Sequence, residues 1–221
     1  MPDVPDALLR PTRQRRSQQT LDRIVEALER LIEEKTFEAI TVAEVCRNAG
    51  ASVGSFYERV GNKDALLEHL RRRFYADMVE AITRAFDPRR FVGCDLASVL
   101  RTNASEMVAL HRARRGAIRA TIVEARRNPQ FGAHATELNQ ILMQRVGACW
   151  LGHRAELRRG PLEPLVRQAF LLAVGFLREA VIWDELWPCV AGGDLEIAES
   201  LTFTLTSFLT GRPPPGTSTT T

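Results

Sequence analysis

The sequence predicts an all-α protein in which a small N-terminal domain is joined by a connecting helix to a larger helical domain. Apolar residues recur at helical spacing along most of the 221 residues, and no alternating run is long enough to propose a sheet. Short helical segments occupy the beginning of the chain, whereas longer ones follow. Apolar residues make up 45% of the chain, so it can bury a core, which excludes global disorder.

Both ends of the chain have the composition of disordered segments. Residues 1–14 contain prolines, and residues 212–221 are rich in proline and threonine. Between them we expect an N-terminal domain over residues 15–62 and a helical domain over residues 63–211. The net charge is only +3, but basic side chains gather just before the first helix, at Arg10, Arg13, Arg15 and Arg16. The sequence therefore predicts a disordered basic arm over residues 1–14.

The N-terminal domain is predicted to contain three helices, followed by the connecting helix. The first helix is expected over residues 17–34, where one apolar stripe runs along its length. Thr41 is suited to cap a second helix, which ends before Gly50. Ser52 is suited to cap a short third helix, and Asn62 caps the fourth, which connects the two domains.

The remainder of the chain is predicted to form five or six longer helices. Proline and glycine pairs mark the breaks between them. The helices are placed near residues 94–113, 115–127, 130–154, 162–186 and 194–210.

The stretch 41–67 has the layout of a helix-turn-helix, the motif that places its second helix in the DNA major groove. Gly50 stands at a helix C-terminus, where a left-handed backbone costs least without a side chain. Phe56 and Val60, four residues apart, are expected to anchor the third helix to the core. Gly54 would allow close approach to the second helix or to the DNA backbone.

This anchoring leaves Val53, Ser55, Tyr57 and Arg59 on other faces of the third helix. Small polar and apolar side chains can contact base edges, while Tyr57, Arg59 and Lys63 can reach phosphates. The alternative is an ordinary three-helix core in which Tyr57 is a surface aromatic residue.

The segment resembles the DNA-binding domain of the TetR family of repressors. That family's pattern is a Thr opening the second helix, then Ala-Gly-Val-Ser, a variable residue, Gly-Thr-hydrophobic-Tyr, a His-Phe pair, and a Lys opening the fourth helix. The chain departs from it conservatively at Ala51 and Ser55, and more noticeably at Arg59 and Val60. It matches at Thr41, Ala49, Gly50, Ser52, Gly54, Phe56, Tyr57 and Lys63. The resemblance covers about residues 15–75 and beyond them is limited to length and helical character.

The resemblance implies that the chain binds double-stranded operator DNA. By that resemblance, Thr41, Tyr57 and Lys63 would contact phosphates. Val53, Ser55 and Tyr57 would face bases, and Ser52 would contact the backbone. The charge and position of the basic arm predict a further contact with the adjacent minor groove or backbone, through Arg13, Arg15 and Arg16.

In this family the last two long helices usually pair with their symmetry mates as a four-helix bundle. The apolar residues of the corresponding helices are expected to form this homodimer interface: Leu165, Phe170, Ala173, Leu177, Val181, Leu195, Ala198, Leu201, Leu205 and Phe208. A monomeric core is the alternative. A dimer would place two recognition helices on half-sites spaced by about 34–36 Å or its multiples.

A ligand pocket is expected between the middle helices. Its candidate wall residues are Met107, His111, Met143, Trp150, Phe170 and Phe176, and the alternative is that each is plain core. Such a wall predicts an apolar or amphipathic effector. We expect no cofactor and no metal, because the four histidines are widely separated in the sequence.

Together these features predict a transcriptional repressor that is released from DNA when an effector shifts its population of states. An activator of the same fold and a DNA-binding accessory protein without a ligand are the alternatives. An enzyme is not expected, because the sequence has no nucleophile–base pattern, phosphate-cradling glycine loop or carboxylate pair at metal spacing. A cytoplasmic protein is expected, since no signal peptide is found and charges interrupt the apolar stretch 165–183.

Overall fold

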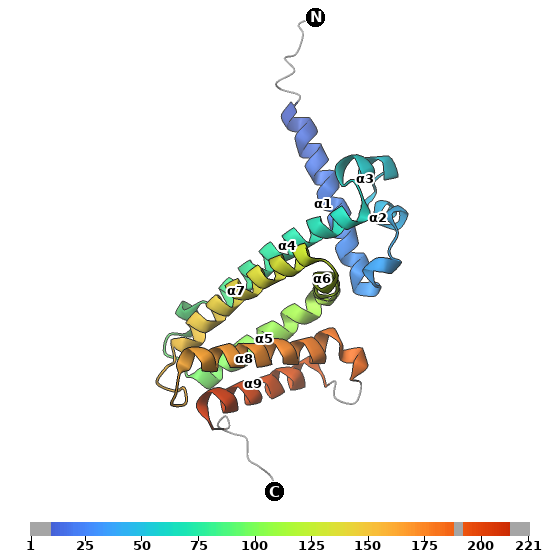
Figure 1. Ribbon diagram of the computed structural model, residues 1–221. Coiled ribbons are helices and arrows are strands. Elements are labelled where there is room, and N and C mark those ends of the chain that lie inside the picture. Colours follow the sequence, from blue (N-terminus) through green and yellow to red (C-terminus); the bar gives the residue numbers. More distant parts are fainter. Residues whose placement is uncertain (1–9, 188–191, 213–221) are drawn as a thin grey trace, which may run out of the picture. The chain divides into compact units, whose positions relative to one another are not determined.

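The computed structural model describes residues 10–187 and 192–212, with side chains from residue 15 onward, and all regular elements in these ranges are helical (Figure 1). The all-α class predicted from the sequence is confirmed. The described residues form two compact units, which divide between Tyr75 and Ala76. In the described ranges no helix combines the length and the apolarity that a membrane span needs.

Helix α1 spans Arg10–Glu34 and therefore starts earlier than the Ser17 that the sequence predicts. Residues 10–14 of the predicted disordered arm are helical, whereas residues 1–9 lie outside the described ranges. Pro11 does not prevent this start, because the N–H groups in the first turn of a helix have no intrahelical partner in any case.

The rest of the N-terminal unit packs against α1. A 3-10 turn, η2 (Phe37–Ala39), leads into α2 (Val42–Ala49) and α3 (Val53–Arg59). Figure 1 shows α2 and α3 on the same side of α1, and both helices contact it. The core of this unit is made by fully buried apolar side chains: Ile24, Leu28, Ile40, Val45, Phe56, Leu66 and Leu70.

Helix α4 (Lys63–Ala85) belongs to both units. The sequence places the domain boundary at residues 62 and 63, whereas the compact units divide about three and a half turns later. The first half of α4 stays with the N-terminal unit because Arg73 pairs with Glu26 at 3.5 Å and with Glu29 at 3.8 Å, both on α1.

In the described ranges the C-terminal unit contains five further α-helices, the first of which is preceded by a short 3-10 turn, η3 (Pro88–Phe91). The helices are α5 (Leu96–Ala113), α6 (Arg115–Arg127), α7 (Pro129–Leu151), α8 (Leu162–Leu177) and α9 (Asp194–Thr210). Helix α5 packs on α9, α6 on α7, and α8 on both α7 and α9. Figure 1 shows α8 and α9 running side by side.

A polar link crosses the core of the C-terminal unit. The buried Asn103 of α5 donates from Nδ2 to the Ala85 carbonyl at 3.2 Å and accepts from Trp150 Nε1, also at 3.2 Å. One amide side chain thus satisfies groups on α4 and α7. A buried polar group is tolerated when it is hydrogen-bonded in this way.

Helix α8 ends sooner than the sequence predicts. The predicted helix continues to residue 186, but a π turn, η4 (Arg178–Ile182), and a 3-10 turn, η5 (Asp184–Leu186), follow Leu177. The Trp183 N–H bonds to the Arg178 carbonyl at 3.0 Å, five residues back. The Ile182 carbonyl at the end of the π turn accepts from Arg115 Nε at 3.3 Å and from Arg119, so helices distant in sequence decide this ending.

An arginine network holds the same segment to α5 and α6. It consists of Arg112, Arg115 and Arg119 with the acids Asp184, Glu185 and Asp194. Arg112 Nη1 lies 2.7 Å from Asp184 Oδ2, and Arg119 also stacks over the Trp183 ring at 4.6 Å from its centroid. Because all six charges are paired, the network joins four elements without leaving a net charge.

Candidate DNA-binding surface

Local hydrogen bonds build the turn between α2 and α3. Thr41 caps α2 by accepting the Glu44 N–H on Oγ1 at 3.2 Å. At the other end Gly50 has a φ of 59°, and the following Ala51 N–H bonds to the Cys46 carbonyl at 3.0 Å. The left-handed glycine predicted from the sequence is confirmed, and it lets the chain reverse within a few residues.

Helix α3 is fixed at its beginning and along one side. Ser52 Oγ accepts the Ser55 N–H at 3.1 Å, so the predicted cap is confirmed. Phe56 and Val60 are buried, as their spacing predicts. The other side of α3 is exposed and consists of Val53, Gly54, Tyr57 and Glu58. We call these four residues the exposed face of α3.

The exposed face is unusual because an apolar and an aromatic side chain lie open beside a glycine. Val53 is 45% exposed and Tyr57 is 54% exposed, with the Tyr57 ring edge-on to Phe56. A Cβ added to Gly54 would meet only Ser52 Oγ, at 3.9 Å. Packing within the chain therefore does not require this glycine, although glycine in a helix costs about 0.5–1 kcal/mol relative to alanine. A surface that a partner approaches closely explains both features.

The two capping hydroxyls can also donate. Each oxygen uses a lone pair to accept a backbone N–H, which leaves its O–H hydrogen available. Thr41 and Ser52 are both exposed, at the beginnings of α2 and α3. This placement suits two hydroxyls for bonds to phosphate oxygens.

Two of the predicted contact residues are engaged within the chain. Arg59 lies back along α3, with Nη1 at 3.2 Å from the Ser55 carbonyl and 3.0 Å from Glu58 Oε2. Lys63 Nζ donates to the Glu38 carbonyl at 3.1 Å and lies over the Phe37 ring. Lys63 keeps two further N–H donors, whereas Arg59 and the half-buried Ser55 lie beside the exposed face rather than on it.

The remaining predictions for this unit concern the arginines of the arm. Arg13, Arg15 and Arg16 lie in the first two turns of α1, where Arg15 and Arg16 are exposed and the Arg13 side chain is outside the described part of the structure. Sequence reasoning also missed Glu58, the residue between Tyr57 and Arg59. Its side chain is 68% exposed. The signal was available, because Glu58 follows Gly54 by four residues and so shares its face of the helix.

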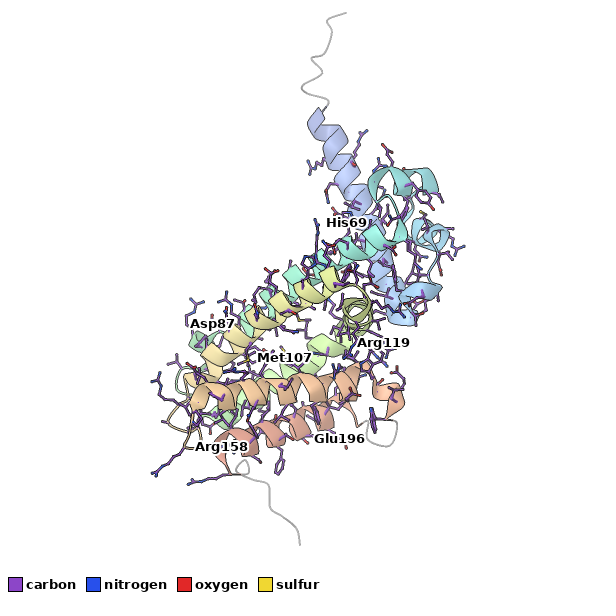
Figure 2. All side chains as sticks on the ribbon, viewed as in Figure 1. His69, Asp87, Met107, Arg119, Arg158 and Glu196 are labelled. Atoms are coloured by element: carbon purple, nitrogen blue, oxygen red, sulfur yellow. The ribbon has the colours of Figure 1, made fainter. Side chains whose placement is uncertain are left out.

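The residues predicted to line a ligand pocket differ in burial. Trp150 and Met107 are buried, and Trp150 is held by Asn103 and packs near Phe86, so both belong to the core. Met107 is labelled on α5 in Figure 2. The others are partly exposed: His111, Met143, Phe170 and Phe176.

His111 is the polar member of this group. Its Nδ1 lies 2.8 Å from the Met107 carbonyl, so Nδ1 carries the hydrogen and Nε2 is an acceptor. Desolvation lowers the pKa of His111, although the bond to Met107 acts in the opposite direction. The imidazole is therefore neutral near pH 7.

The residues predicted for a dimer interface are mostly used inside the chain. Six of them are buried in the C-terminal unit: Leu165, Leu177, Val181, Ala198, Leu201 and Leu205. Phe170, Ala173 and Phe208 are partly exposed, and Leu195 is 71% exposed. Together with Leu195, the exposed large apolar residues of these helices are Leu171, Leu172 and Phe203, and we call these four residues the α8–α9 surface.

The described part of the chain contains no group of three or more His, Cys, Asp or Glu residues that could hold a metal ion.

The comparison with protein families finds a match within the N-terminal unit. Residues 24–70 match the family model described as bacterial regulatory proteins, tetR family. The matched segment contains α2, α3 and the beginning of α4, and therefore the whole exposed face of α3. No curated protein matches the chain.

Solved structures share the fold over nearly the whole chain. A TetR-family transcriptional regulator from Mesorhizobium loti is 18% identical, with a TM-score of 0.69 over 90% of this chain and 99% of the other. FadR from Bacillus subtilis, solved with stearoyl-CoA, is 18% identical, with a TM-score of 0.63 over 87% and 98%. NalD from Pseudomonas aeruginosa, a repressor of a multidrug efflux pump, is 16% identical, with a TM-score of 0.59 over 88% and 98%.

Proposed function

We propose that this DNA-binding transcriptional regulator, which belongs to the TetR family by its N-terminal domain, is a repressor that binds a palindromic operator as a dimer and is released by a small molecule. The family consists of transcriptional regulators and not of enzymes. The observation that carries the proposal is the exposed face of α3, where Val53 and Tyr57 lie open on a helix that is fixed by Ser52 and Phe56.

In the proposed complex α3 enters the major groove. Val53 and Tyr57 contact base edges, and the glycine between them lets the helix approach closely. The hydroxyls of Thr41 and Ser52, together with the ammonium of Lys63, donate to phosphates. The arginines at the beginning of α1 (Arg13, Arg15 and Arg16) add contacts to the adjacent backbone or minor groove.

Dimerisation follows from the size of the recognition element. One helix of seven residues contacts few base pairs, whereas two copies related by symmetry read two half-sites. We place the contact between copies on the α8–α9 surface, because Leu171 and Phe203 are exposed there although most apolar residues of both helices are buried. Burying such residues against a second copy removes apolar surface from water.

The proposed effector is apolar or amphipathic and binds in the C-terminal unit. Partly exposed apolar side chains there, with one neutral histidine acceptor, suit a ligand with a long apolar part. The same fold accommodates an acyl-CoA in FadR from Bacillus subtilis, which supports this choice. The effector would release DNA by binding better to dimers whose recognition helices are wrongly spaced, with a coupling of about 1–3 kcal/mol.

The first experiment measures binding of the purified chain to DNA from around its own gene at several salt concentrations. We expect sequence-selective binding at roughly 10⁻⁸–10⁻¹¹ M, which Tyr57→Ala abolishes. Val92→Ala is the matched control, since Val92 is 84% exposed and lies outside α3. The proposal would be contradicted if the chain binds all DNA sequences with the same weak affinity and Tyr57→Ala does not change that affinity.

The second experiment tests the dimer by sedimentation. Leu171→Glu and Phe203→Glu are expected to give monomers that bind operator weakly, whereas Val92→Glu stays dimeric, because only the first two place a charge in the proposed interface. If all three variants sediment like the unaltered chain, the α8–α9 surface is not the interface. A reporter gene behind the operator then separates repression from activation.

A further inference from the structure

Glu58 brings a negative charge to the surface on which the proposed function places DNA. Its side chain is 68% exposed, and the other three residues of the exposed face of α3 are uncharged. A carboxylate has only acceptor atoms and is repelled by phosphates. A carboxylate on the exposed face of α3 that only faced the DNA backbone would weaken binding to every DNA sequence.

Glu58 leaves the helix beside the middle of the exposed face. It follows Gly54 by four residues and Ser55 by three, so its side chain starts next to the turn that contains both. Gly54 has no side chain to fill that place, and a Cβ there would have nothing closer than Ser52 Oγ at 3.9 Å. The surface over Gly54 is therefore open, so a base edge can approach the carboxylate that lies beside it.

One oxygen of this carboxylate is held by its neighbour. Arg59 Nη1 donates to Glu58 Oε2 at 3.0 Å and to the Ser55 carbonyl at 3.2 Å, so the guanidinium ties the acid to the helix itself. Within the described residues Oε1 has no hydrogen-bond donor. An oriented acceptor with one free oxygen remains on the exposed face.

In the major groove, exocyclic amino groups of bases are the donors that such an acceptor can read, and the carboxylate's typical partner is N4 of cytosine. We propose that Glu58 selects a cytosine at one position of each half-site by accepting a hydrogen bond from its N4 amino group, with Arg59 as the positioning residue. The proposal rests on the proposed function, because it requires α3 to enter the major groove.

The test selects operators from DNA in which each half-site base pair is randomised, at fixed salt, and then measures affinities for the single-base variants. The unaltered chain is expected to prefer cytosine at one position by roughly tenfold, since a good base contact gives about 1–3 kcal/mol of discrimination. Glu58→Ala and Glu58→Gln are expected to lose that cytosine preference, and Glu58→Ala also to bind random DNA more tightly.

Glu80→Gln is the matched control, because Glu80 is also exposed but lies in the C-terminal unit, where its loss changes the net charge equally. If Glu58→Ala strengthens binding to all sequences and leaves every base preference intact, the carboxylate does not read a base and the proposal is overturned. If the unaltered chain binds all sequences alike, the proposed function itself falls as well.

Arg59→Ala separates positioning from a direct phosphate contact. As a positioning residue, Arg59 affects the cytosine preference while the salt dependence of binding to random DNA stays unchanged. A phosphate contact would instead weaken all sequences uniformly and reduce the salt slope by about 1, which would overturn the role given to Arg59. Arg59→Lys, which keeps a donor near Glu58, is expected to restore part of the preference.

Discussion

The two units of the chain are stabilised in different ways. In the N-terminal unit the polar contacts that shape α2, α3 and the start of α4 are local, each joining residues three positions apart: Thr41 with Glu44, Ser52 with Ser55, and Asn62 with Ala65. In the C-terminal unit the decisive contacts join residues far apart in the sequence. Asn103 bonds to Trp150, and Arg115 bonds to Ile182 and Asp184.

This difference teaches where each unit is sensitive. A small unit with local caps has few core side chains, so losing one anchor removes much of its stability. A larger unit with long-range polar links is sensitive where one side chain satisfies several helices. The unfolding of the C-terminal unit can be followed separately by tryptophan fluorescence, because the three tryptophans (Trp150, Trp183 and Trp187) all lie in that unit.

The largest effect is expected for Phe56→Ala. Phe56 is fully buried and anchors α3, and removing such a ring costs about 3–5 kcal/mol. Urea unfolding should show an early transition by far-UV circular dichroism, while the tryptophan fluorescence transition hardly moves. If both transitions shift together, the two units unfold as one and the comparison between them fails.

Asn103→Leu should have the next largest effect, in the other unit. The change leaves the Trp150 N–H buried without its partner, at about 1–3 kcal/mol, whereas the Ala85 carbonyl keeps its bond from Arg90. The tryptophan fluorescence transition should therefore move to lower urea. Asn48→Leu, at an exposed residue of α2, is the control and should leave that transition in place.

Ser52 separates stability from DNA binding in the N-terminal unit. Ser52→Ala removes the cap of α3 and should cost about 1 kcal/mol, whereas Ser52→Asp keeps a good cap. Ser52→Asp is nevertheless expected to bind operator much more weakly, because its charge faces phosphate. Equal operator affinity for Ser52→Asp and the unaltered chain would show that this hydroxyl lies away from the DNA.

Acid should affect the C-terminal unit first, through His111. Burial lowers the pKa of His111, so the unfolded chain binds the proton more readily than the folded chain does. The stability of this unit is therefore complete above the unfolded pKa of about 6.5 and decreases as the pH falls below it. Urea midpoints followed by tryptophan fluorescence from pH 8 to pH 5 should show this decrease. His111→Gln should reduce it, and an unchanged pH dependence in that variant would contradict the prediction.

The smallest effect is expected at Glu68 in the N-terminal unit. Hydrogen bonds from Arg71 and Arg72 lower the pKa of Glu68 from 4.5 to about 2. The stabilisation is therefore present above pH 4.5 and is lost as the pH falls toward 2. Since these charges are partly in contact with water, the difference between Glu68→Gln and the unaltered chain at pH 7 should stay below about 1 kcal/mol. Circular dichroism melts at pH 7 and pH 3 should show that the difference becomes smaller in acid.

The sequence predicted the site best where its geometry is local. The caps Thr41 and Ser52, the left-handed Gly50 and the buried Phe56 were all identified from residue type and spacing. Arg59 shows the limit of this reasoning. A charged residue beside the recognition face was expected to reach phosphate, but its side chain lies along its own helix and bonds to Ser55 and Glu58.

By itself the sequence determined the all-α class, the order of the helices and the helix-turn-helix, because helical periodicity, caps and turn glycines act over a few residues. Only the tertiary structure decided which apolar residues of α8 and α9 are core and which are exposed. Leu201 and Phe203 are equally suited to either role in the sequence, yet the first is buried and the second is exposed. The end of α8 was decided in the same way, since the donors that satisfy the Ile182 carbonyl come from α6, far away in the chain. The local pattern of residues determines which segments are helical. The contacts with distant segments determine which side chains of a helix are buried and where the helix ends.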